Sequence, residues 1–404
     1  MQTTEQAAPQ GAAPSLDTDP FSDDFLTMPY PHHAQMRDAG PVVWLQRYGV
    51  WAMARHTEVK AAFNDWSSFI SSAGVGLANF RTEAPFRPKS LILEADPPDH
   101  TRARAVLARI LSPKMMMQVK AEFTRQAEQL VDALVEKGEI DGTMELAERY
   151  PLRVFPDAVG LSDTGRENLL LYGDMVFNSF GPRNAIFQKA VERYEPVSKW
   201  IMDKCRREEL RPGGFGDQIY QAADQGEITY EEAPLLVRSF LTAGVDTTVN
   251  GLGNALYCMA TYPEQYARLL ATPELARPAF EEVLRFESPV QTFFRTTSKP
   301  MEFAGVHLKE NQKVLLFLAS ANRDERQWKH ADVFNIERKP TGHMAFGSGI
   351  HGCVGQVVAR LEGEVVLGAL ARRVKRIEFT GDPTRRLNNT LRAFSSLPLR
   401  LVPH

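Results

Sequence analysis

The stretch Phe346–Gly355, FGSGIHGCVG, decides the fold of this chain because it places one cysteine among small residues. Gly352 precedes Cys353 and Gly355 follows it; glycine lets the backbone pass close to a flat ligand and leaves amide N–H groups free to point at the sulfur. The next segment, Val357–Val374, is apolar at helical spacing, so Cys353 lies just before a helix N-terminus, whose positive dipole end lowers the pKa of a thiol. A thiolate in such a pocket is a metal ligand or a nucleophile. The alternative for an isolated cysteine is a small buried apolar residue.

Composition and charge exclude several classes of protein. The 404 residues are 43% apolar and 24% charged, as in globular proteins with a large core, and the net charge of −3 argues against nucleic-acid binding. Three widely spaced cysteines form neither a disulfide framework nor a zinc-binding pattern, which indicates a reducing compartment. Residues 1–16, MQTTEQAAPQGAAPSL, predict a disordered tail. No apolar run approaches the roughly 20 residues that span a bilayer, so we expect a cytoplasmic protein that is not inserted in a membrane.

Hydrophobic periodicity predicts a mainly helical chain with a small β region. Residues 41–55 read as a β-hairpin, and the irregular loop 71–90, rich in Gly and Pro, is long enough to cover an active site. Strands are expected at 293–297, from FAGVHL to VLLFLAS, and in the closing segments RIEF and LPLRLV. Helices are expected at 57–64, from 96 onward, and at 115–137, 146–159, 166–177 and 196–205.

The longest helix is predicted to begin at the capping box Thr229–Glu232 and to end before Pro263, a length of about 50 Å. Its middle reads AGVDTTVNG. The Thr247 hydroxyl can bond back to the Ala243 carbonyl, and Gly244 removes a side chain at that turn. We therefore expect the helix to open locally and leave a groove, although the same pattern also fits a plain kink.

Two further motifs are ambiguous by themselves. Glu282 and Arg285 lie one helical turn apart, which at a surface is a weak ion pair. His100 and Arg104, in the sequence HTRAR after Asp96-Pro-Pro, share one helix face, and such a face is ordinarily a solvated basic surface.

Taken in order, these motifs resemble those of the cytochromes P-450. F-x-x-G-x-x-x-C-x-G resembles the haem-thiolate loop of that family, D-P-P followed by H-T-R-A-R its propionate-binding helix, and A-G-V-D-T-T its oxygen-binding groove. E-x-x-R together with F-N-I-E-R is similar to its scaffold motifs. The resemblance implies a mainly α fold with haem b between the long central helix and the helix after the cysteine loop. It also implies that residues 17–404 form a single catalytic domain.

The resemblance assigns roles to individual residues. Cys353 would bind the iron, Asp246 and Thr247 would deliver protons to bound dioxygen, and Glu282, Arg285 and Arg338 would form a buried structural cluster. The remaining haem contacts would be His100, Arg104, Ala243, Gly244, Arg295, Phe346, Gly347, His351 and Gly355.

Substrate residues are expected on the long helix and in the covering loop. Arg238 and Ser239, entering an otherwise apolar cavity, would recognise a carboxylate, and Arg87 and Ser90 would join them. The cavity walls would be Phe177, Phe180 and Phe293. Segments such as RPKSLILEADPP, FNSFGP and NNTLRAFSSLP look like those of the bacterial cytochromes P-450 that oxidise para-substituted benzoates, notably by demethylating 4-methoxybenzoate.

The resemblance also implies external electron donors, a [2Fe–2S] ferredoxin and an NAD(P)H-dependent ferredoxin reductase, because no nucleotide-binding motif is present. Arg102, Arg109 and Lys114 are candidates for docking an acidic ferredoxin, or they form an ordinary solvated surface. Two alternative functions remain open, a monooxygenase for a neutral methoxyphenol and a haem protein that senses a ligand. The Asp246–Thr247 pair argues against the sensor, which needs no proton relay.

Overall fold

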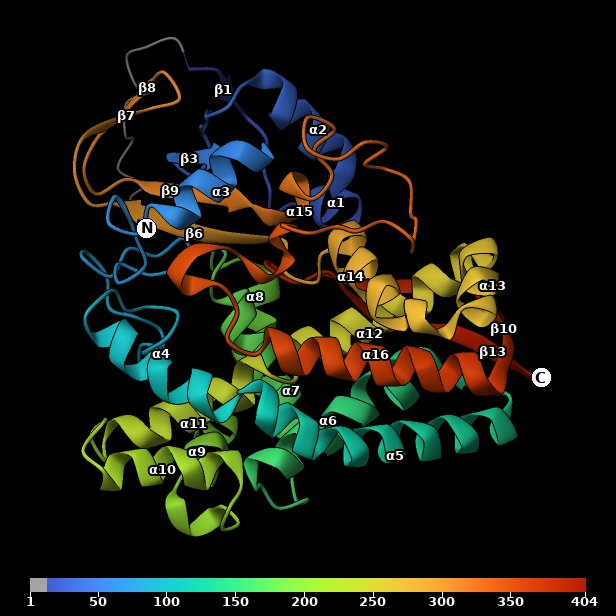
Figure 1. Ribbon diagram of the computed structural model, residues 1–404. Coiled ribbons are helices and arrows are strands. Elements are labelled where there is room, and N and C mark those ends of the chain that lie inside the picture. Colours follow the sequence, from blue (N-terminus) through green and yellow to red (C-terminus); the bar gives the residue numbers. More distant parts are fainter. Residues whose placement is uncertain (1–12) are drawn as a thin grey trace.

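The computed structural model describes residues 13–404 and has a sheet-rich part joined to a larger helical part (Figure 1). The main sheet has the strand order β1-β2-β3-β9-β6-β4. Its strands are β1 (Ser15–Leu16), β2 (Val43–Leu45), β3 (Val50–Met53), β4 (Phe69–Ile70), β6 (Thr292–Thr297) and β9 (Lys313–Phe317). Helices α1 (Asp23–Thr27), α2 (Pro29–Ala39), α3 (His56–Asn64) and α15 (Leu318–Ala321) lie in the same part.

The predicted hairpin is confirmed, because β2 and β3 pair antiparallel with Trp44 opposite Trp51. The prediction of a disordered tail over residues 1–16 is wrong at the C-terminal end of that segment. Ser15–Leu16 form β1, which pairs with Trp44–Leu45, since the backbone groups at this sheet edge offer hydrogen bonds that composition does not reveal. Residues 1–12 lie outside the described part of the chain.

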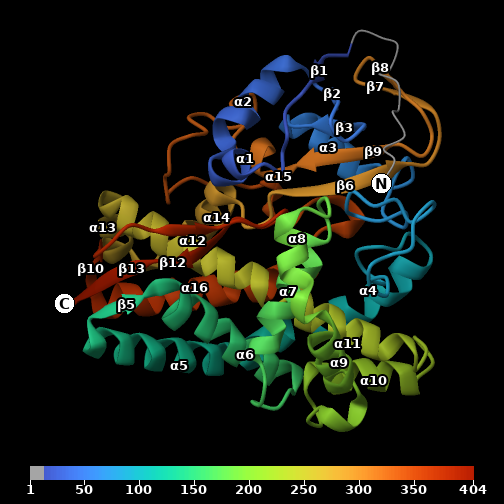
Figure 2. The same cartoon turned by 180° about the vertical axis from the view of Figure 1, so that it is seen from behind.

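Smaller sheets complete the β structure. β5 (Glu139–Asp141), β10 (Val374–Phe379) and β13 (Pro398–Pro403) form one sheet beside the C-terminus, seen from behind in Figure 2. Two-stranded sheets form between β7 (Met301–Phe303) and β8 (Val306–Leu308) and between β11 (Thr384–Arg386) and β12 (Ala393–Ser396).

The helical part contains α4 to α14 and α16. Their bounds are α4 (Asp99–Ile110), α5 (Pro113–Lys137), α6 (Arg149–Val159), α7 (Glu167–Asn178), α8 (Ala185–Ala190), α9 (Tyr194–Lys204), α10 (Phe215–Asp224), α11 (Glu232–Ala243), α12 (Asp246–Thr261), α13 (Pro263–Ala271), α14 (Ala276–Glu287) and α16 (Gln356–Arg373). A π-helix, Gly142–Glu148, leads into α6, so the helix predicted from residue 146 begins earlier and with a wider turn.

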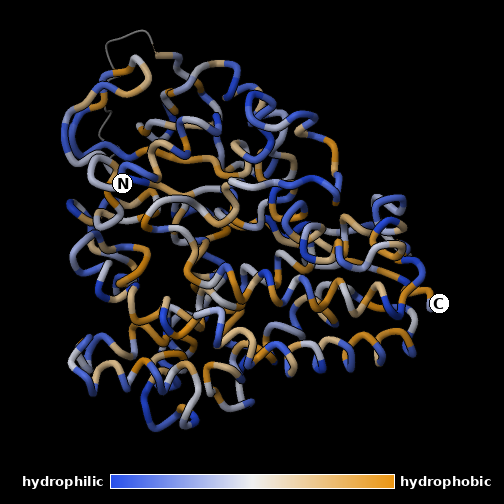
Figure 3. The backbone as a smooth tube through the Cα atoms, in the orientation of Figure 1, coloured by the Kyte–Doolittle hydropathy of each residue, from blue (hydrophilic) through white to orange (hydrophobic). Residues whose placement is uncertain are grey.

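Amphipathic packing places α5 against α16, side by side in Figures 1 and 2. Hydrophobic and hydrophilic residues alternate within the turns of α5 (Figure 3). The buried side of this helix includes Phe123, Val131 and Leu134. Within residues 13–404, no helix is both long and apolar enough to cross a membrane.

The long helix predicted between Thr229 and Pro263 is two helices, α11 and α12, separated at Gly244–Val245. Its capping box is confirmed, since the Thr229 amide donates to Glu232 Oε2 at 2.8 Å and the Glu232 amide donates to Thr229 Oγ1 at 3.3 Å. The predicted local opening therefore interrupts the helix completely.

Candidate active site

The cysteine loop is a tight turn held by backbone bonds. Gly347 and Gly349 have φ values of 68° and 67°, a left-handed conformation that glycine adopts without strain. A Cβ on Gly349 would lie 2.6 Å from the Phe63 carbonyl oxygen of α3. The Cys353 amide donates to the Phe346 carbonyl at 2.8 Å, which fixes the sulfur at the start of α16.

The surroundings of the sulfur favour a neutral thiol when no cation is bound to it. Burial raises the pKa of Cys353 above its usual value, while the amides of Gly355 and Gln356 and the charges of Arg104 and Arg360 act in the opposite direction. The lowering expected from the helix N-terminus is present, but burial outweighs it. Coordination to a metal ion deprotonates a thiol outright, so this sulfur suits a metal ligand better than a free nucleophile.

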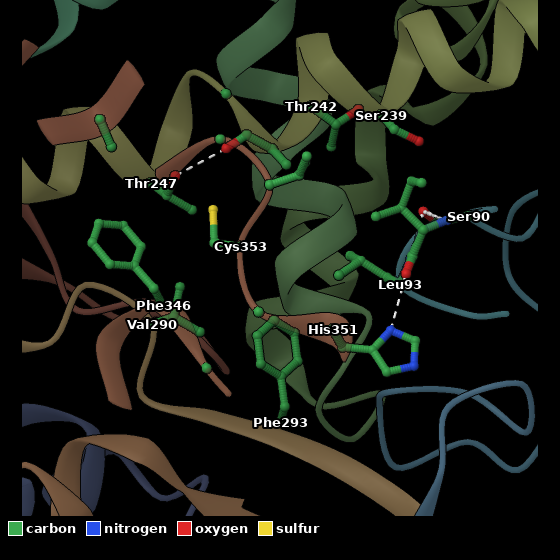
Figure 4. A pocket seen from close by; sticks show the side chains of 18 of the residues that line it. Ser90, Leu93, Ser239, Thr242, Thr247, Val290, Phe293, Phe346, His351 and Cys353 are labelled. Carbon is green, nitrogen blue, oxygen red and sulfur yellow. Dashed lines mark hydrogen bonds between the residues drawn. The ribbon is translucent and has the colours of Figure 1, made fainter. Parts of the chain in front are cut away.

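Cys353 faces a large apolar cavity that lies between the cysteine loop and the break between α11 and α12 (Figure 4). The empty space in it, open solvent at its mouth included, is about 1660 Å³. Ala243, Gly244, Thr247 and Phe346 also line it. Residues of the cysteine loop and of the helix break therefore face the same cavity.

Cations with unused hydrogen-bonding capacity gather at one side of this cavity. Arg104 donates to the Gly352 carbonyl at 2.5 Å, but its Nη1 has no partner among the described residues. Arg295 lines the cavity and donates to the Phe294 carbonyl at 2.8 Å. Burial lowers the pKa of Arg295 to about 10. These two guanidinium groups suit a buried anion.

Two histidines lie beside these arginines. The rings of His100 and His351 are 4.3 Å apart, and neither ring nitrogen of His100 has a partner among residues 13–404. Burial, with the nearby His351 and Arg104, lowers the pKa of His100 to about 4. His351 Nδ1 contacts the Ile92 carbonyl at 3.2 Å, and its Nε2 lies 3.7 Å from Asp96. His100 can therefore turn a ring N–H toward an added carboxylate, whereas a neutral His351 gives its one N–H to the Ile92 carbonyl.

The proposed proton-relay residues occupy different positions. Thr247 lines the cavity, and its hydroxyl donates to the Ala243 carbonyl at 2.9 Å, as predicted. Asp246 points away from the cavity and packs against α7, where a Cβ on Gly173 would lie 1.5 Å from Oδ2. Burial raises the pKa of Asp246 well above its usual range, so it is a neutral acid behind the helix break.

The Glu282, Arg285 and Arg338 side chains form one buried cluster. Both oxygens of Glu282 accept from Arg285 at 2.8 Å, and Arg338 Nε donates to Glu282 at 3.1 Å. Arg285 also donates to the Asn322 and Ala331 carbonyls, which connects α14 to the segment that leads to the cysteine loop.

The residues predicted to bind substrate all line the same cavity, but their hydrogen bonds differ. Arg87 makes two bonds to Glu94, at 3.0 and 3.3 Å, and Ser239 donates to the Leu235 carbonyl at 2.9 Å. Arg238 donates through Nη2 to the Pro88 and Lys89 carbonyls, at 2.9 and 3.1 Å.

Arg238 and Ser90, at the same end of the cavity, each carry a hydrogen-bond donor that has no partner among the described residues. Arg238 Nη1 has no partner in the described part of the chain. The Ser90 oxygen accepts from the Ile92 and Leu93 amides, at 3.3 and 3.1 Å, so its hydrogen is free. The side chains of Phe177, Phe180 and Phe293 form the wall, with ring centroids 5.8 Å apart in successive pairs.

Comparison with known proteins identifies the family. The family model described as cytochrome P-450 matches residues 162–272 and 273–399. The chain is also 56% identical to cytochrome P-450 CYP199A2 of Rhodopseudomonas palustris over 391 residues, which are 96% of this chain and 95% of that protein. The chain belongs to the cytochrome P-450 family. Cytochrome P-450 107B1 of Saccharopolyspora erythraea is 30% identical over 94% of this chain and 96% of that protein.

Solved cytochrome P-450 structures share the fold. The structure of CYP109Q5 from Chondromyces apiculatus matches with a TM-score of 0.81 and 29% identity over 96% of this chain and 99% of that one. A cytochrome P-450 epoK structure with bound epothilone D matches with a TM-score of 0.85 and 26% identity, over 96% of this chain and all of that one. The predicted mainly α cytochrome P-450 fold is confirmed, and this chain is a haem b-dependent monooxygenase that takes electrons from redox partners.

The residues of this cytochrome P-450 fit haem b. The Cys353 sulfur faces the cavity, and the unpartnered atoms of His100 and Arg104, with Arg295 and His351, suit the two carboxylates of the porphyrin. Gly347 and Gly355 line the cavity without side chains of their own, and a Cβ on Gly355 would lie 3.9 Å from Cys353 Sγ.

Sequence reasoning missed residues whose partners lie in other elements. Glu94 and Arg360 belong to no motif, since one lies in an irregular loop and the other on a helix face with no recognisable spacing. Two of the docking candidates form ion pairs within the chain, Arg102 with Glu232 at 2.6 Å and Arg109 with Glu227 at 2.8 Å. Those two charges are largely neutralised within the chain.

Proposed function

We propose that this cytochrome P-450 oxidises para-substituted benzoic acids, above all by O-demethylation of 4-methoxybenzoate to 4-hydroxybenzoate and formaldehyde. The observation that carries the proposal is Arg238. Its side chain is only 2% exposed and lines an apolar cavity, it has no carboxylate partner among the described residues, and its Nη1 is unpaired. A buried guanidinium with a free donor is costly unless an anion binds to it.

The carboxylate would bind between Arg238 and Ser90, with Arg87 and Ser239 beside them. The Arg87–Glu94 pair is electrically neutral, so of the two arginines at this end of the cavity only Arg238 lacks a carboxylate partner among the described residues, which matches a monoanion. Phe177, Phe180 and Phe293 would hold the ring, and the para substituent would then point toward Cys353.

When bound, haem supplies activated oxygen: one atom of O₂ becomes a hydroxyl on the substrate carbon and the other leaves as water, at the expense of two electrons and two protons. With a methoxy group the product is a hemiacetal, which breaks its carbon–oxygen bond to give the phenol and formaldehyde. Thr247 Oγ1 would hold a proton at the cavity wall, and the neutral Asp246 would resupply that proton only after its side chain turns from α7 toward the cavity. The apolar wall excludes water from the reacting carbon.

The proposal includes the remaining expectations. Residues 17–404 act as a single catalytic domain in the cytoplasm, where the free cysteines Cys205, Cys258 and Cys353 stay reduced. Electrons come from a [2Fe–2S] ferredoxin that is reduced by an NAD(P)H-dependent reductase. Because Arg102 and Arg109 are already paired, Lys114 remains of the three docking candidates.

The test is a titration of the ferric haem protein with 4-methoxybenzoate and with its methyl ester, followed by the haem absorption band. Replacing Arg238 by Met should weaken binding of the acid by about 1–3 kcal/mol and leave binding of the ester unchanged. Arg102→Met, which removes a surface guanidinium, is the matched control and should change neither. Equal binding of acid and ester to the parent protein would exclude the carboxylate anchor and favour a neutral methoxyphenol as substrate.

Formaldehyde production with ferredoxin, reductase and NAD(P)H tests the reaction itself. Tight binding of 4-methoxybenzoate without any formaldehyde or hydroxylated product would favour the ligand sensor instead.

A further inference from the structure

A chain of polar contacts lies behind the cysteine loop, on the side away from the substrate residues, and the proposed function does not use it. Its centre is Glu281 of α14, beside Glu282 of the buried cluster. One Glu281 oxygen is 2.8 Å from His343 Nε2, and Arg360 of α16 binds both oxygens, through Nε and, at 3.5 Å, through Nη2. Glu281 therefore joins α14 to α16 and to the segment before the cysteine loop, both of which lie far from α14 in the sequence.

Both ends of this chain reach the cysteine loop. His343 Nδ1 accepts from the Ala345 amide at 3.2 Å. Arg360 donates to Gln356 Oε1 at 2.5 Å, and Gln356 Nε2 donates to the Cys353 carbonyl at 3.0 Å. The path Ala345–His343–Glu281–Arg360–Gln356–Cys353 is therefore continuous.

Arg360 is held over the aromatic ring next to the sulfur. Its guanidinium carbon lies 4.5 Å from the centre of the Phe346 ring, which Figure 4 shows beside Cys353. The Arg360 and Glu281 side chains are only 19% and 18% exposed, so solvent screens their charges less than those of surface groups. Burial acts to raise the pKa of Glu281, but hydrogen bonds from His343 and Arg360 outweigh it and lower that pKa to about 2. The Glu281 carboxylate is thus charged near neutral pH.

We propose that Glu281 is a positioning residue that holds Arg360 above Phe346, and that the fixed positive charge of Arg360 raises the reduction potential of the haem bound to Cys353. Reduction adds one electron, delivered by the redox partner, to ferric iron and gives ferrous iron. A cation held near the sulfur stabilises the reduced form, and the Glu281 carboxylate moderates this effect. The assignment depends on membership of the family and not on the identity of the substrate.

The experiment is a spectroelectrochemical titration of the haem-loaded, substrate-free protein. Arg360→Gln removes the cation and should shift the potential to a more negative value than that of the parent. Glu281→Gln keeps the shape and hydrogen-bonding capacity of the side chain, leaves the cation uncompensated, and should shift the potential to a more positive value. Arg360→Lys keeps the charge without the planar fork and should stay closer to the parent than Arg360→Gln.

Glu364→Gln is the matched control. Glu364 lies four residues after Arg360 on α16 and pairs with Lys120 at 2.9 Å, away from the cysteine loop, so this variant should keep the parent potential. A purely structural role would lower stability in both variants without opposite shifts in potential.

Unchanged potentials in Arg360→Gln and Glu281→Gln, or shifts in the same direction, would overturn the proposal. If Arg360→Gln does not take up haem, a potential for Glu281→Gln at or below that of the parent would overturn it equally well. Affinity for 4-methoxybenzoate, measured in the same samples, reports on the substrate proposal separately, because these residues do not line the substrate end of the cavity.

Discussion

Gly244 is the residue at which the helix facing the cysteine ends. A Cβ at this position would lie 2.2 Å from Phe155 Cε1 and 2.7 Å from the Phe240 carbonyl oxygen. The break between α11 and α12 is therefore held by the Phe155 ring of α6 as well as by the Thr247 hydroxyl bond that the sequence predicts.

Replacing Gly244 by Ala should lower the free energy of unfolding by about 1–3 kcal/mol, because the new methyl group overpacks against Phe155. Urea unfolding of the haem-loaded protein measures the change. Gly253→Ala is the control: on α12, the nearest atom to the new methyl group is 3.9 Å away, so it should be neutral or stabilising. In the double variant with Phe155→Leu the loss should shrink, and an undiminished loss would mean that Phe155 is not the cause.

At the scale of elements, helix α16 packs in the interior and buries an acidic side chain that has no hydrogen-bond partner among the described residues. Glu362 is fully buried, and neither of its oxygens has a hydrogen-bond partner among the described residues. Burial raises its pKa well above the usual value, and the neighbouring Tyr150 of α6 also has a raised pKa, first through its own burial and then through Glu362. Glu362 is therefore protonated in the folded protein.

The sign of the resulting pH dependence follows from linkage. Above about pH 4.5, the ordinary pKa of a glutamate, the unfolded chain releases this proton while the folded chain keeps it, so Glu362 contributes less to stability as pH rises. Glu362→Gln removes the titration, and its thermal stability relative to the parent should increase from about pH 5 to about pH 8. Glu364→Gln, a change of the same kind at a partly exposed site on α16, should show no such trend. A constant difference between parent and Glu362→Gln would contradict a neutral Glu362.

At the scale of the whole molecule, the cluster of Glu282, Arg285 and Arg338, here called the Glu282 cluster, attaches α14 to the segment before the cysteine loop. Arg285 and Glu282 are fully buried, so the loss of one partner leaves a charge that water cannot reach. The cysteine loop itself has only short 3-10 turns, at Met344–Phe346 and Gly349–His351, so the cluster adds to the backbone bonds that hold the sulfur in place.

Glu282→Gln should lower the free energy of unfolding by about 3–5 kcal/mol and release haem more readily, because Arg285 and Arg338 lose their counter-charge. Glu337→Gln removes the partner of Arg268 from an exposed pair and should cost no more than about 1 kcal/mol. Chemical unfolding and transfer of haem to an acceptor protein measure the two effects. Similar small losses in both variants would show that the cluster does not hold the cysteine loop.

The sequence by itself determined the family, the cysteine loop and two contacts that lie within one helical turn. The bond from Thr247 to Ala243 and the pair Glu282–Arg285 follow from helix geometry alone, because residues three or four apart share a face.

Only the tertiary structure decided that Asp246 points away from the cavity, that Glu94 neutralises Arg87, and that Glu281 binds Arg360. These outcomes depend on how separate helices and an irregular loop pack together. Packing is set by shape and burial over the whole chain, and no local spacing in the sequence records it.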